Sequence, residues 1–136
     1  MNILKVYLVE DSAVIRASLI AALEELAPVV VSATAEDEQS AVTWMADASH
    51  QCDLAIIDIQ LRAGSGLGVI SAAQKLLNRP KLAVLSNYAT SDIRRKCLAL
   101  GANRVFDKSN DIEALIDYCN KLASGEPSDS DRATLA

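Results

Sequence analysis

The segment at residues 53–67, DLAIIDIQLRAGSGL, decides the fold, because an apolar run reaches the acidic residue Asp58 and leads into a glycine-rich stretch. Unbroken apolar runs rich in β-branched residues are typical of strands that are covered on both faces of a sheet. Gly64 and Gly66 follow this run without the lysine of a phosphate-binding Walker loop, so a turn that enters a helix is favoured. The segment therefore predicts a buried strand with an acid at its carboxyl end.

The same pattern recurs along the chain, where apolar runs occupy residues 3–9, 29–33, 54–59, 82–85 and 104–106. Between and after the runs, apolar residues recur three and four positions apart, which is the period of a helix with one buried face. The five stripes are Ile15, Leu19, Ala22, Leu23 and Leu26; Ala41, Trp44, Met45 and Ala48; Ile70, Ala73 and Leu77; Ile93, Cys97 and Leu100; and Ile112, Leu115, Ile116, Cys119 and Leu122. Five strands alternating with five helices predict an α/β fold, with a parallel sheet covered by helices on both faces.

Residues that favour helix ends agree with these limits. Ser91 can cap the fourth helix, and Gly101 can close it. Asn110 followed three residues later by Glu113 resembles a capping box and predicts the start of the fifth helix there.

The length of 136 residues fits one domain with a sizeable core, and an apolar content of 51% excludes disorder of the whole chain. Residues 1–123 are predicted to form that domain. Residues 124–136 are small and polar and have no apolar period, so they are predicted to form a flexible C-terminal tail.

The charge balance argues against direct binding of nucleic acid, because 13 basic and 18 acidic residues give a net charge of −5. The one dense basic cluster, Arg94-Arg95-Lys96, is interpreted as a solvated helix face. Cys52, Cys97 and Cys119 have no metal-binding spacing and favour a reducing compartment. The first apolar run is short and ends in two acids, so it predicts neither a signal peptide nor membrane insertion. We expect a soluble cytoplasmic protein.

Polar residues stand at the ends of the predicted strands: Glu10 and Asp11, Asp58, Ser86, and Lys108. In an open parallel sheet, ligands bind at the carboxyl ends of the strands, near the switch in strand order. Three carboxylates at one edge repel one another and raise each other's pKa unless a cation joins them. Mg²⁺ suits such a site, because it prefers oxygen ligands and shares its coordination with phosphate. Lys108 adds a mobile positive charge, and Ser86 adds a hydroxyl donor.

These residues resemble the receiver domain of two-component response regulators, and the match covers about residues 3–122. It rests on four motifs in order, which are VYLVEDS at 6–12, DLAIIDIQLRAGSGL at 53–67, AVLSNYA at 83–89 and GANRVFDKS at 101–109. The resemblance implies a doubly wound, flavodoxin-like fold with five helices and the strand order 2-1-3-4-5.

The resemblance also implies roles for the site residues. Asp58 would be the phosphoacceptor that receives a phosphoryl group from a histidine kinase or a histidine phosphotransfer protein. Asp11 would ligate Mg²⁺ directly together with Asp58, Glu10 would act largely through water, and the backbone carbonyl of Gln60 would complete the protein's ligands.

Lys108 and Mg²⁺ would neutralise charge on the phosphoryl group, and Ser86 would move toward it. The change would reach the surface around the fourth helix, the fifth strand and the fifth helix, where a downstream protein binds. The chain would thus be a switch and not an enzyme, although slow self-dephosphorylation is expected. By the same resemblance, Gln60 and Tyr88 would flank the path of the hydrolytic water, and our hypothesis is that Tyr88 shields the phosphoryl group. The sequence does not decide whether the protein forms a homodimer.

Three departures from the family pattern affect the output. Val105 replaces an aromatic residue three positions before Lys108, and Phe106 should point to the opposite side of its strand. Ser109 replaces the proline that usually follows the lysine, and Arg62 replaces a common proline after the acceptor. We interpret these departures as variation in output and not as loss of phosphoacceptance.

Three other functions compete with this interpretation. The strongest is a phosphate-independent pseudo-receiver that acts as a protein-binding module, which the altered Val105 and Ser109 favour. A phosphatase with an aspartyl nucleophile typically carries a second acid two residues later, where this chain has Gln60. A flavin carrier is disfavoured, because Glu10 and Asp11 would repel the cofactor's phosphate.

Overall fold

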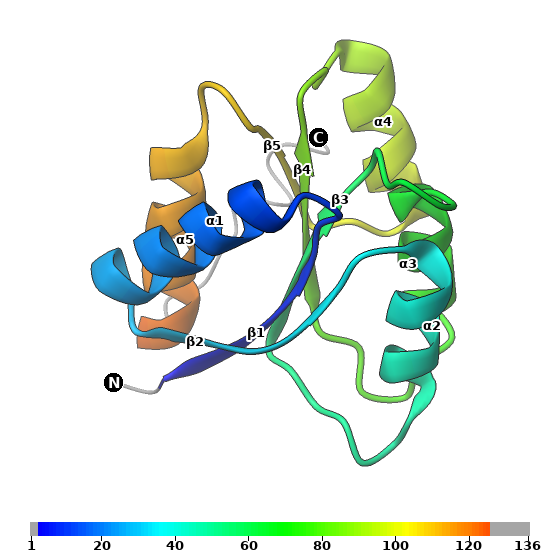
Figure 1. Ribbon diagram of the computed structural model, residues 1–136, viewed down its shortest axis with the longest axis horizontal. Helices are drawn as coiled ribbons and strands as arrows, with labels where there is room; N and C mark the ends of the chain where they lie inside the picture. Colours follow the sequence, from blue (N-terminus) through cyan, green and yellow to red (C-terminus); the bar gives the residue numbers. More distant parts are fainter. Residues whose placement is uncertain (1–2, 126–136) are drawn as a thin grey trace.

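The computed structural model describes residues 3–125 and has five strands and five helices in alternation. The strands are β1 (Leu4–Val9), β2 (Val29–Ala35), β3 (Leu54–Asp58), β4 (Lys81–Ser86) and β5 (Arg104–Asp107). The helices are α1 (Ala13–Leu26), α2 (Glu38–Ala46), α3 (Gly66–Ala73), α4 (Ser91–Leu100) and α5 (Ile112–Ser124). All strand pairs are parallel, and the order is β2-β1-β3-β4-β5 (Figure 1). This confirms the predicted doubly wound fold.

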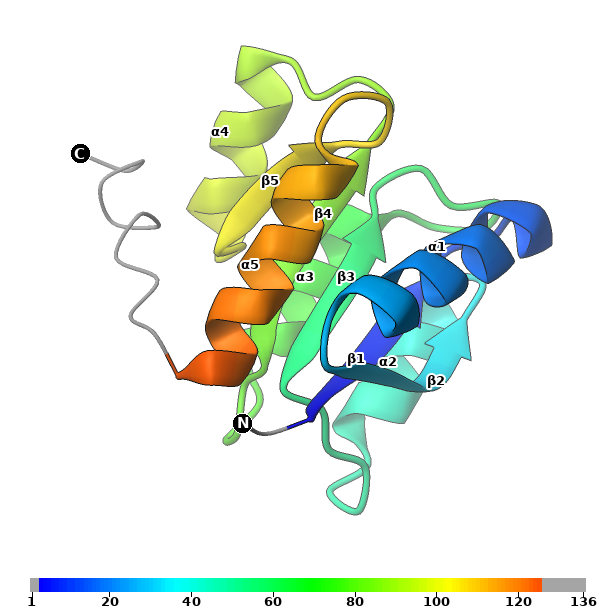
Figure 2. The same ribbon diagram turned by 90° about the vertical axis from the view of Figure 1, so that its left-hand side faces the viewer.

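The sheet separates two helical layers, with α1 and α5 on one face and α2, α3 and α4 on the other (Figures 1 and 2). Successive strand residues alternate between the two cores, because side chains in a strand point to opposite faces. Val105 packs with the α2, α3 and α4 layer, whereas Phe106 packs with the α1 and α5 layer. The predicted opposite orientation of Val105 and Phe106 is therefore confirmed.

The central strand β3 anchors both cores. Leu54, Ile56 and Ile57 are fully buried, as is expected of a strand with helices on both sides. Burying one such side chain stabilises the fold by about 1.5–3 kcal/mol. The strand that carries Asp58 is thus held rigidly, and its last side chain is displayed at the carboxyl edge of the sheet.

Two helix starts differ from the prediction by one residue. Thr90, not Ser91, caps α4, because its Oγ1 accepts a hydrogen bond from the Ile93 amide at 3.2 Å. Asp111, not Asn110, precedes α5, and it makes no side-chain capping bond to that helix. Gly101 closes α4 in the left-handed region at φ 119°, as predicted.

The predicted apolar stripes extend beyond the ends of α2 and α3. Ala48 and Leu77 lie outside these helices, and Leu77 is fully exposed. After Ala73 the hydrogen bonds tighten to the i→i+3 pattern, for example from the Leu76 amide to the Ala73 carbonyl at 3.2 Å. A tighter turn rotates the following residue off the buried face, so the helical period no longer applies.

Between residues 3 and 125, none of the helices combines the length and apolar character needed to cross a membrane. The predicted tail at 124–136 falls almost wholly outside the described residues, and its flexibility stays a prediction, as does the domain boundary at residue 123.

Candidate functional site

The carboxyl ends of β1, β3, β4 and β5 bring together the polar residues that the sequence singled out. Glu10 and Asp11 follow β1, and the Glu10 amide extends the ladder to β2 by donating to the Ala35 carbonyl at 2.9 Å. Asp58 is the last residue of β3. Because β1 pairs with β3 through Val9 and Ile57, the residues that follow these positions lie side by side.

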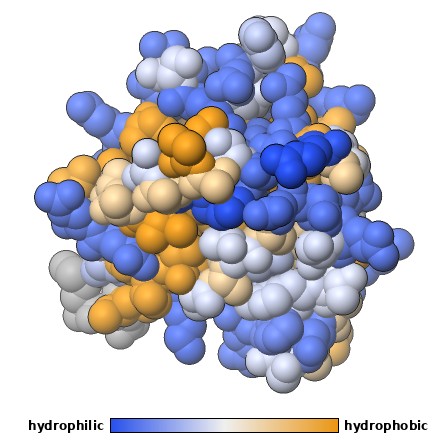
Figure 3. Space-filling view, viewed as in Figure 1, coloured by the Kyte–Doolittle hydropathy of each residue, from blue (hydrophilic) through white to orange (hydrophobic). Residues whose placement is uncertain are grey.

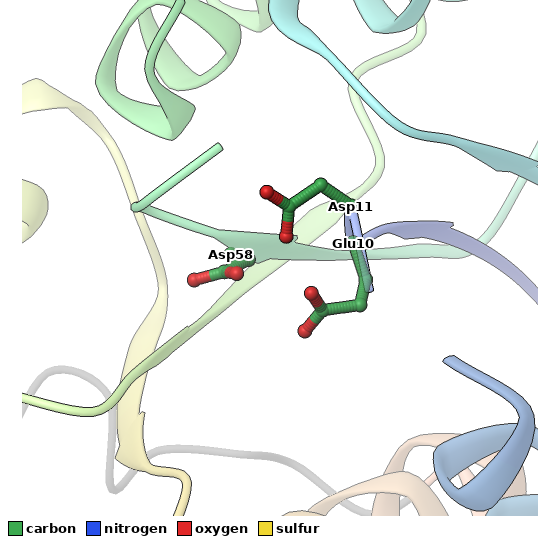
Figure 4. A group of neighbouring side chains, drawn as sticks. All are labelled: Glu10, Asp11 and Asp58. Atoms are coloured by element: carbon green, nitrogen blue, oxygen red, sulfur yellow. The ribbon is translucent and has the colours of Figure 1, made fainter. Parts of the chain in front are cut away.

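Glu10, Asp11 and Asp58 form a cluster in which one carboxylate oxygen of each lies within 4.8 Å of the others. Figure 4 shows the three side chains converging from the ends of two neighbouring strands. Glu10 is 1% exposed and Asp58 is 5% exposed, so two of these charges are taken out of water. Burial of like charges is unfavourable without a compensating cation.

Lys108 supplies a compensating charge from the segment after β5. Its Nζ donates to Glu10 Oε1 at 2.6 Å and to Asp58 Oδ2 at 3.0 Å. Burial alone would lower the pKa of Lys108, but its hydrogen bonds to the two carboxylates and their charges raise the pKa overall. The lysine therefore stays charged and links β5 to β1 and β3.

The pKa of Asp58 is raised from 3.8 to about 6. Burial is the largest cause, and the charge of Glu10 adds to it. The hydrogen bond and charge of Lys108 act in the opposite direction, as does the Gln60 amide, which donates to Asp58 Oδ1 at 3.2 Å. One lysine thus compensates the carboxylate only in part, so a further positive charge beside Asp58 would be favourable.

Ser86 and Lys108 are coupled through the backbone, since the Lys108 amide donates to the Ser86 carbonyl at 3.0 Å. The Ser86 side chain is buried, and its Oγ accepts from the Tyr88 amide at 3.1 Å. Tyr88 itself is 66% exposed. The hydroxyl therefore stands where the buried strand becomes an exposed loop.

Arg94 has a role that the sequence did not indicate. Its Nε donates to the Ala89 carbonyl at 3.0 Å, and one terminal nitrogen donates to the Val105 carbonyl at 2.9 Å. The other terminal nitrogen reaches Asp111 Oδ2 at 3.4 Å. The predicted solvated helix face therefore holds only in part for Arg94, whose side chain is 40% exposed but bonded to other segments. The prediction fits its neighbour Arg95, which is exposed and pairs with Asp92. Only the tertiary structure distinguishes two consecutive arginines, because both occupy one helix and have the same chemistry.

A comparison with protein-family models matches residues 6–120 to the response regulator receiver domain. This chain belongs to that family. A receiver domain is the signalling phosphoacceptor of a two-component system, so membership supports a switch over a conventional enzyme. None of the curated proteins matches the sequence closely enough to count as a relative.

Solved structures of receivers resemble this one throughout. The signal receiver domain of the putative response regulator NarL from Mycobacterium tuberculosis has a TM-score of 0.80 at 20% identity, covering 93% of this chain and 100% of that one. The response regulator domain of Thermotoga maritima CheB has a TM-score of 0.78 at 18% identity, covering 93% and 100%. A DNA-binding response regulator of the LuxR family from Staphylococcus aureus has a TM-score of 0.77 at 17% identity, covering 88% and 98%. At such identities the likeness shows the fold.

Proposed function

We propose that this receiver is a phosphoacceptor switch in which Asp58 takes a phosphoryl group from the phosphohistidine of a histidine kinase or a histidine phosphotransfer protein. One observation carries the proposal: the Asp58 carboxylate is buried among Glu10, Asp11 and Lys108 at the carboxyl edge of the sheet. A structural aspartate would need neither two neighbouring acids nor a lysine from the segment that follows another strand. We place the switch in the cytoplasm, where its phosphodonor would reach it.

The residues present fit Mg²⁺. The cluster offers oxygen ligands only, and the raised pKa of Asp58 indicates that Lys108 alone does not balance its charge. Glu10, Asp11 and Asp58 would hold the ion, with the backbone carbonyl of Gln60 as a further ligand. When bound, Mg²⁺ would neutralise charge on the oxygens of the transferring phosphoryl group.

The transfer itself needs little from the receiver beyond positioning and charge. A carboxylate oxygen of Asp58 attacks phosphorus, the P–N bond of the partner's phosphohistidine breaks, and the imidazole leaves with the electron pair. The partner's imidazole leaves as a neutral ring when its other nitrogen, which does not carry the phosphoryl group, is already protonated. The product on Asp58 is an acyl phosphate. Lys108 would then pair with a phosphoryl oxygen in place of the carboxylate oxygen that it now contacts at 3.0 Å.

The output would pass from Ser86 to the surface of α4, β5 and α5. In the present structure, Ser86 Oγ accepts a hydrogen bond from the Tyr88 amide at 3.1 Å. This hydrogen bond would break when the hydroxyl turns toward the phosphoryl group. The loop after Ser86 leads to Ala89, whose carbonyl is held by Arg94. Because Arg94 also contacts β5 and the start of α5, a shift of this loop would be transmitted to both elements.

A matched pair of arginines tests this route. After phosphorylation, amide exchange in α4, β5 and α5 should change in the wild type and in Arg95→Ala, and the change should be lost in Arg94→Ala. Equal responses in the two variants would contradict transmission through Arg94.

The phosphodonor would dock on α1, which begins at Ala13, two residues after Asp11. Val14 is 78% exposed and Ile15 is 38% exposed, and Leu26 is exposed at the far end of the helix. Figure 3 shows apolar side chains gathered on the face where α1 lies, beside hydrophilic ones. An apolar helix face next to the acceptor suits the helical surface of a partner that carries the phosphohistidine.

The deciding experiment is intact mass spectrometry after incubation with acetyl phosphate, with Mg²⁺ or with EDTA. We expect the wild type to gain one phosphoryl group only with Mg²⁺, and Asp58→Ala to gain none. Asp53→Ala is the matched control, because Asp53 lies at the other end of the same strand and should leave the gain intact. Tyr88→Ala should then lose the group faster than the wild type if Tyr88 shields it from water.

The second candidate is the phosphate-independent binding module, which the replacement of the family's aromatic residue by Val105 favours. It predicts no mass gain under any condition, although the fold and its surfaces would be intact. A mass gain abolished in Asp58→Ala would exclude it.

A further inference from the structure

The loop between β3 and α3, at residues 59–65, is attached to the start of α2 through one residue, Glu38. The Glu38 carboxylate accepts from the Ser65 amide at 2.8 Å through Oε1. The Glu38 amide donates to the Ala63 carbonyl at 3.1 Å. Both the backbone and the side chain of this half-buried glutamate therefore hold the same loop.

Two glycines leave the space that the Glu38 side chain occupies. A Cβ at Gly64 would lie 2.4 Å from Glu38 Cβ, and a Cβ at Gly68 would lie 2.2 Å from Glu38 Oε2. Gly64 also has φ +81°, which disfavours other residues. At both positions, the three nearest atoms that a Cβ would meet all belong to Glu38. The two glycines and the glutamate thus form one fitted contact.

The held loop bears directly on the backbone of the acceptor. The Gly66 amide donates to the Ile59 carbonyl at 2.9 Å, and Gln60 and Ser65 form an isolated antiparallel bridge. A Cβ at Gly66 would lie 2.2 Å from the Asp58 carbonyl oxygen, so this turn packs too closely against the end of β3 for any side chain at residue 66. Any shift of Ser65 therefore moves Gln60, whose amide contacts Asp58 Oδ1.

The charge of Glu38 favours the same arrangement. Ser65 caps α3, since its Oγ accepts from the Leu67 amide at 3.1 Å. The Glu38 carboxylate, bound to the Ser65 amide, therefore lies at the amino end of α3, where the helix dipole stabilises a negative charge. The contact is charge-assisted, and such hydrogen bonds are the stronger ones.

We propose that Glu38 is a positioning residue, which holds the loop at 59–65 in the shape that the Mg²⁺ and phosphoryl site requires. This inference rests on the proposed function of that site. Arg62 stands in this loop without the stiffness of a proline, and the contact with Glu38 supplies the constraint from outside the loop. Glu38 touches neither the metal nor the phosphoryl group and acts through Ser65, Gln60 and Asp58.

The test is the dissociation constant of Mg²⁺, measured by calorimetry on the full chain. Glu38→Ala should weaken Mg²⁺ binding about 10- to 100-fold, as is usual when a group that orients metal ligands is removed. Glu38→Gln keeps an acceptor for the Ser65 amide and should recover part of the affinity. Glu24→Ala is the matched control, because Glu24 also accepts from a backbone amide, that of Val31 at 2.9 Å, but far from the site. It should lower stability without changing Mg²⁺ affinity.

Gly68→Ala keeps the test decisive if Glu38→Ala folds poorly. Alanine favours the helix more than glycine does, yet its Cβ displaces the Glu38 carboxylate, so binding should weaken while the metal-free protein stays folded. In the double variant the two effects should not add, since both remove one contact. Wild-type affinity in both Glu38→Ala and Gly68→Ala would overturn this inference alone, whereas a wild type that binds no Mg²⁺ would overturn the proposed metal site and this inference with it.

Discussion

An aspartate stands at each end of β3, and the two aspartates differ in burial and in the charges that surround them. Asp53, just before the strand, is exposed, and its carboxylate accepts one hydrogen bond from the Lys5 amide at 2.8 Å. Asp58, at the carboxyl end, is 5% exposed and lies among two further acids and a lysine. The first arrangement ties two strand ends together at no electrostatic cost. The second is electrostatically unfavourable by itself, which supports the proposal that a cation and a phosphoryl group bind there.

The largest effect should follow the loss of Lys108. Lys108→Ala leaves Glu10 and Asp58 buried without their partner, and we expect the metal-free protein to lose about 3 kcal/mol of unfolding free energy. The measurement is urea denaturation in EDTA. Lys5→Ala is the control at the opposite end, where the Asp53 carboxylate accepts from the backbone amide of Lys5, which the substitution keeps. A loss below that of Lys5→Ala would mean that the acids at the carboxyl edge are not strained.

Asp58→Asn should act in the opposite direction and more weakly. Removing one of the repelling charges should raise the unfolding free energy in EDTA by about 2 kcal/mol, because an ionised Asp58 is disfavoured by burial and by Glu10. Mg²⁺ should then stabilise the wild type more than the variant. Asp53→Asn should leave thermal stability nearly unchanged in both conditions. Equal melting temperatures for Asp58→Asn and Asp53→Asn would mean that the two ends of β3 do not differ in electrostatic strain.

The pH dependence of stability should show the same contrast. A carboxyl whose pKa rises from 3.8 to about 6 on folding stabilises the folded state most when it is protonated. Its contribution is fully present below the pKa of the unfolded chain and is lost as the pH rises through 6. The metal-free wild type should therefore lose stability relative to Asp58→Asn between pH 4 and 7, by about 2 kcal/mol at most. The measurement is chemical denaturation of both proteins across this pH range. Unfolding free energies that change with pH in the same way in both would contradict this prediction.

The smallest effect concerns a buried polar group away from the edge. Tyr7 is fully buried in the middle of β1, its hydroxyl has no hydrogen-bond partner within residues 3–125, and burial raises its pKa. Tyr7→Phe removes this hydroxyl and should stabilise the protein by about 1 kcal/mol. Phosphorylation and Mg²⁺ affinity should be unchanged. A loss of stability in thermal melts would reveal a partner for the hydroxyl, and slower phosphorylation would connect the middle of the sheet to the site.

The sequence predicted the fold correctly because its signal is repeated five times. The buried runs around Ile56 and Val84 and the helical stripes between them each have their own period, so an error in one element does not change the topology. The polar residues at the strand ends were found for the same reason, since parallel strands bring their carboxyl ends to one edge. Errors arose at Ser91, Asn110 and Leu77, where a boundary depends on the exact turn that the chain takes.

The residues that support the site could not be predicted in this way. Glu38 and Arg94 carry no motif, and their partners lie in other elements, at Ser65 for the one and at Ala89, Val105 and Asp111 for the other. A single long polar side chain on a helix has many partners within reach, and only packing selects among them.

The sequence by itself determined the alternation of strands and helices and which acids, hydroxyl and lysine reach the carboxyl edge. Periodicity and chain order suffice for these, because side chains in a strand alternate and parallel strands align. The tertiary structure alone decided how far Lys108 compensates Glu10 and Asp58, which arginine joins α4 to β5, and that Glu38 fits between Gly64 and Gly68. These depend on distances of a few ångströms between segments far apart in the chain, and hydrogen bonds and charge interactions change steeply over such distances.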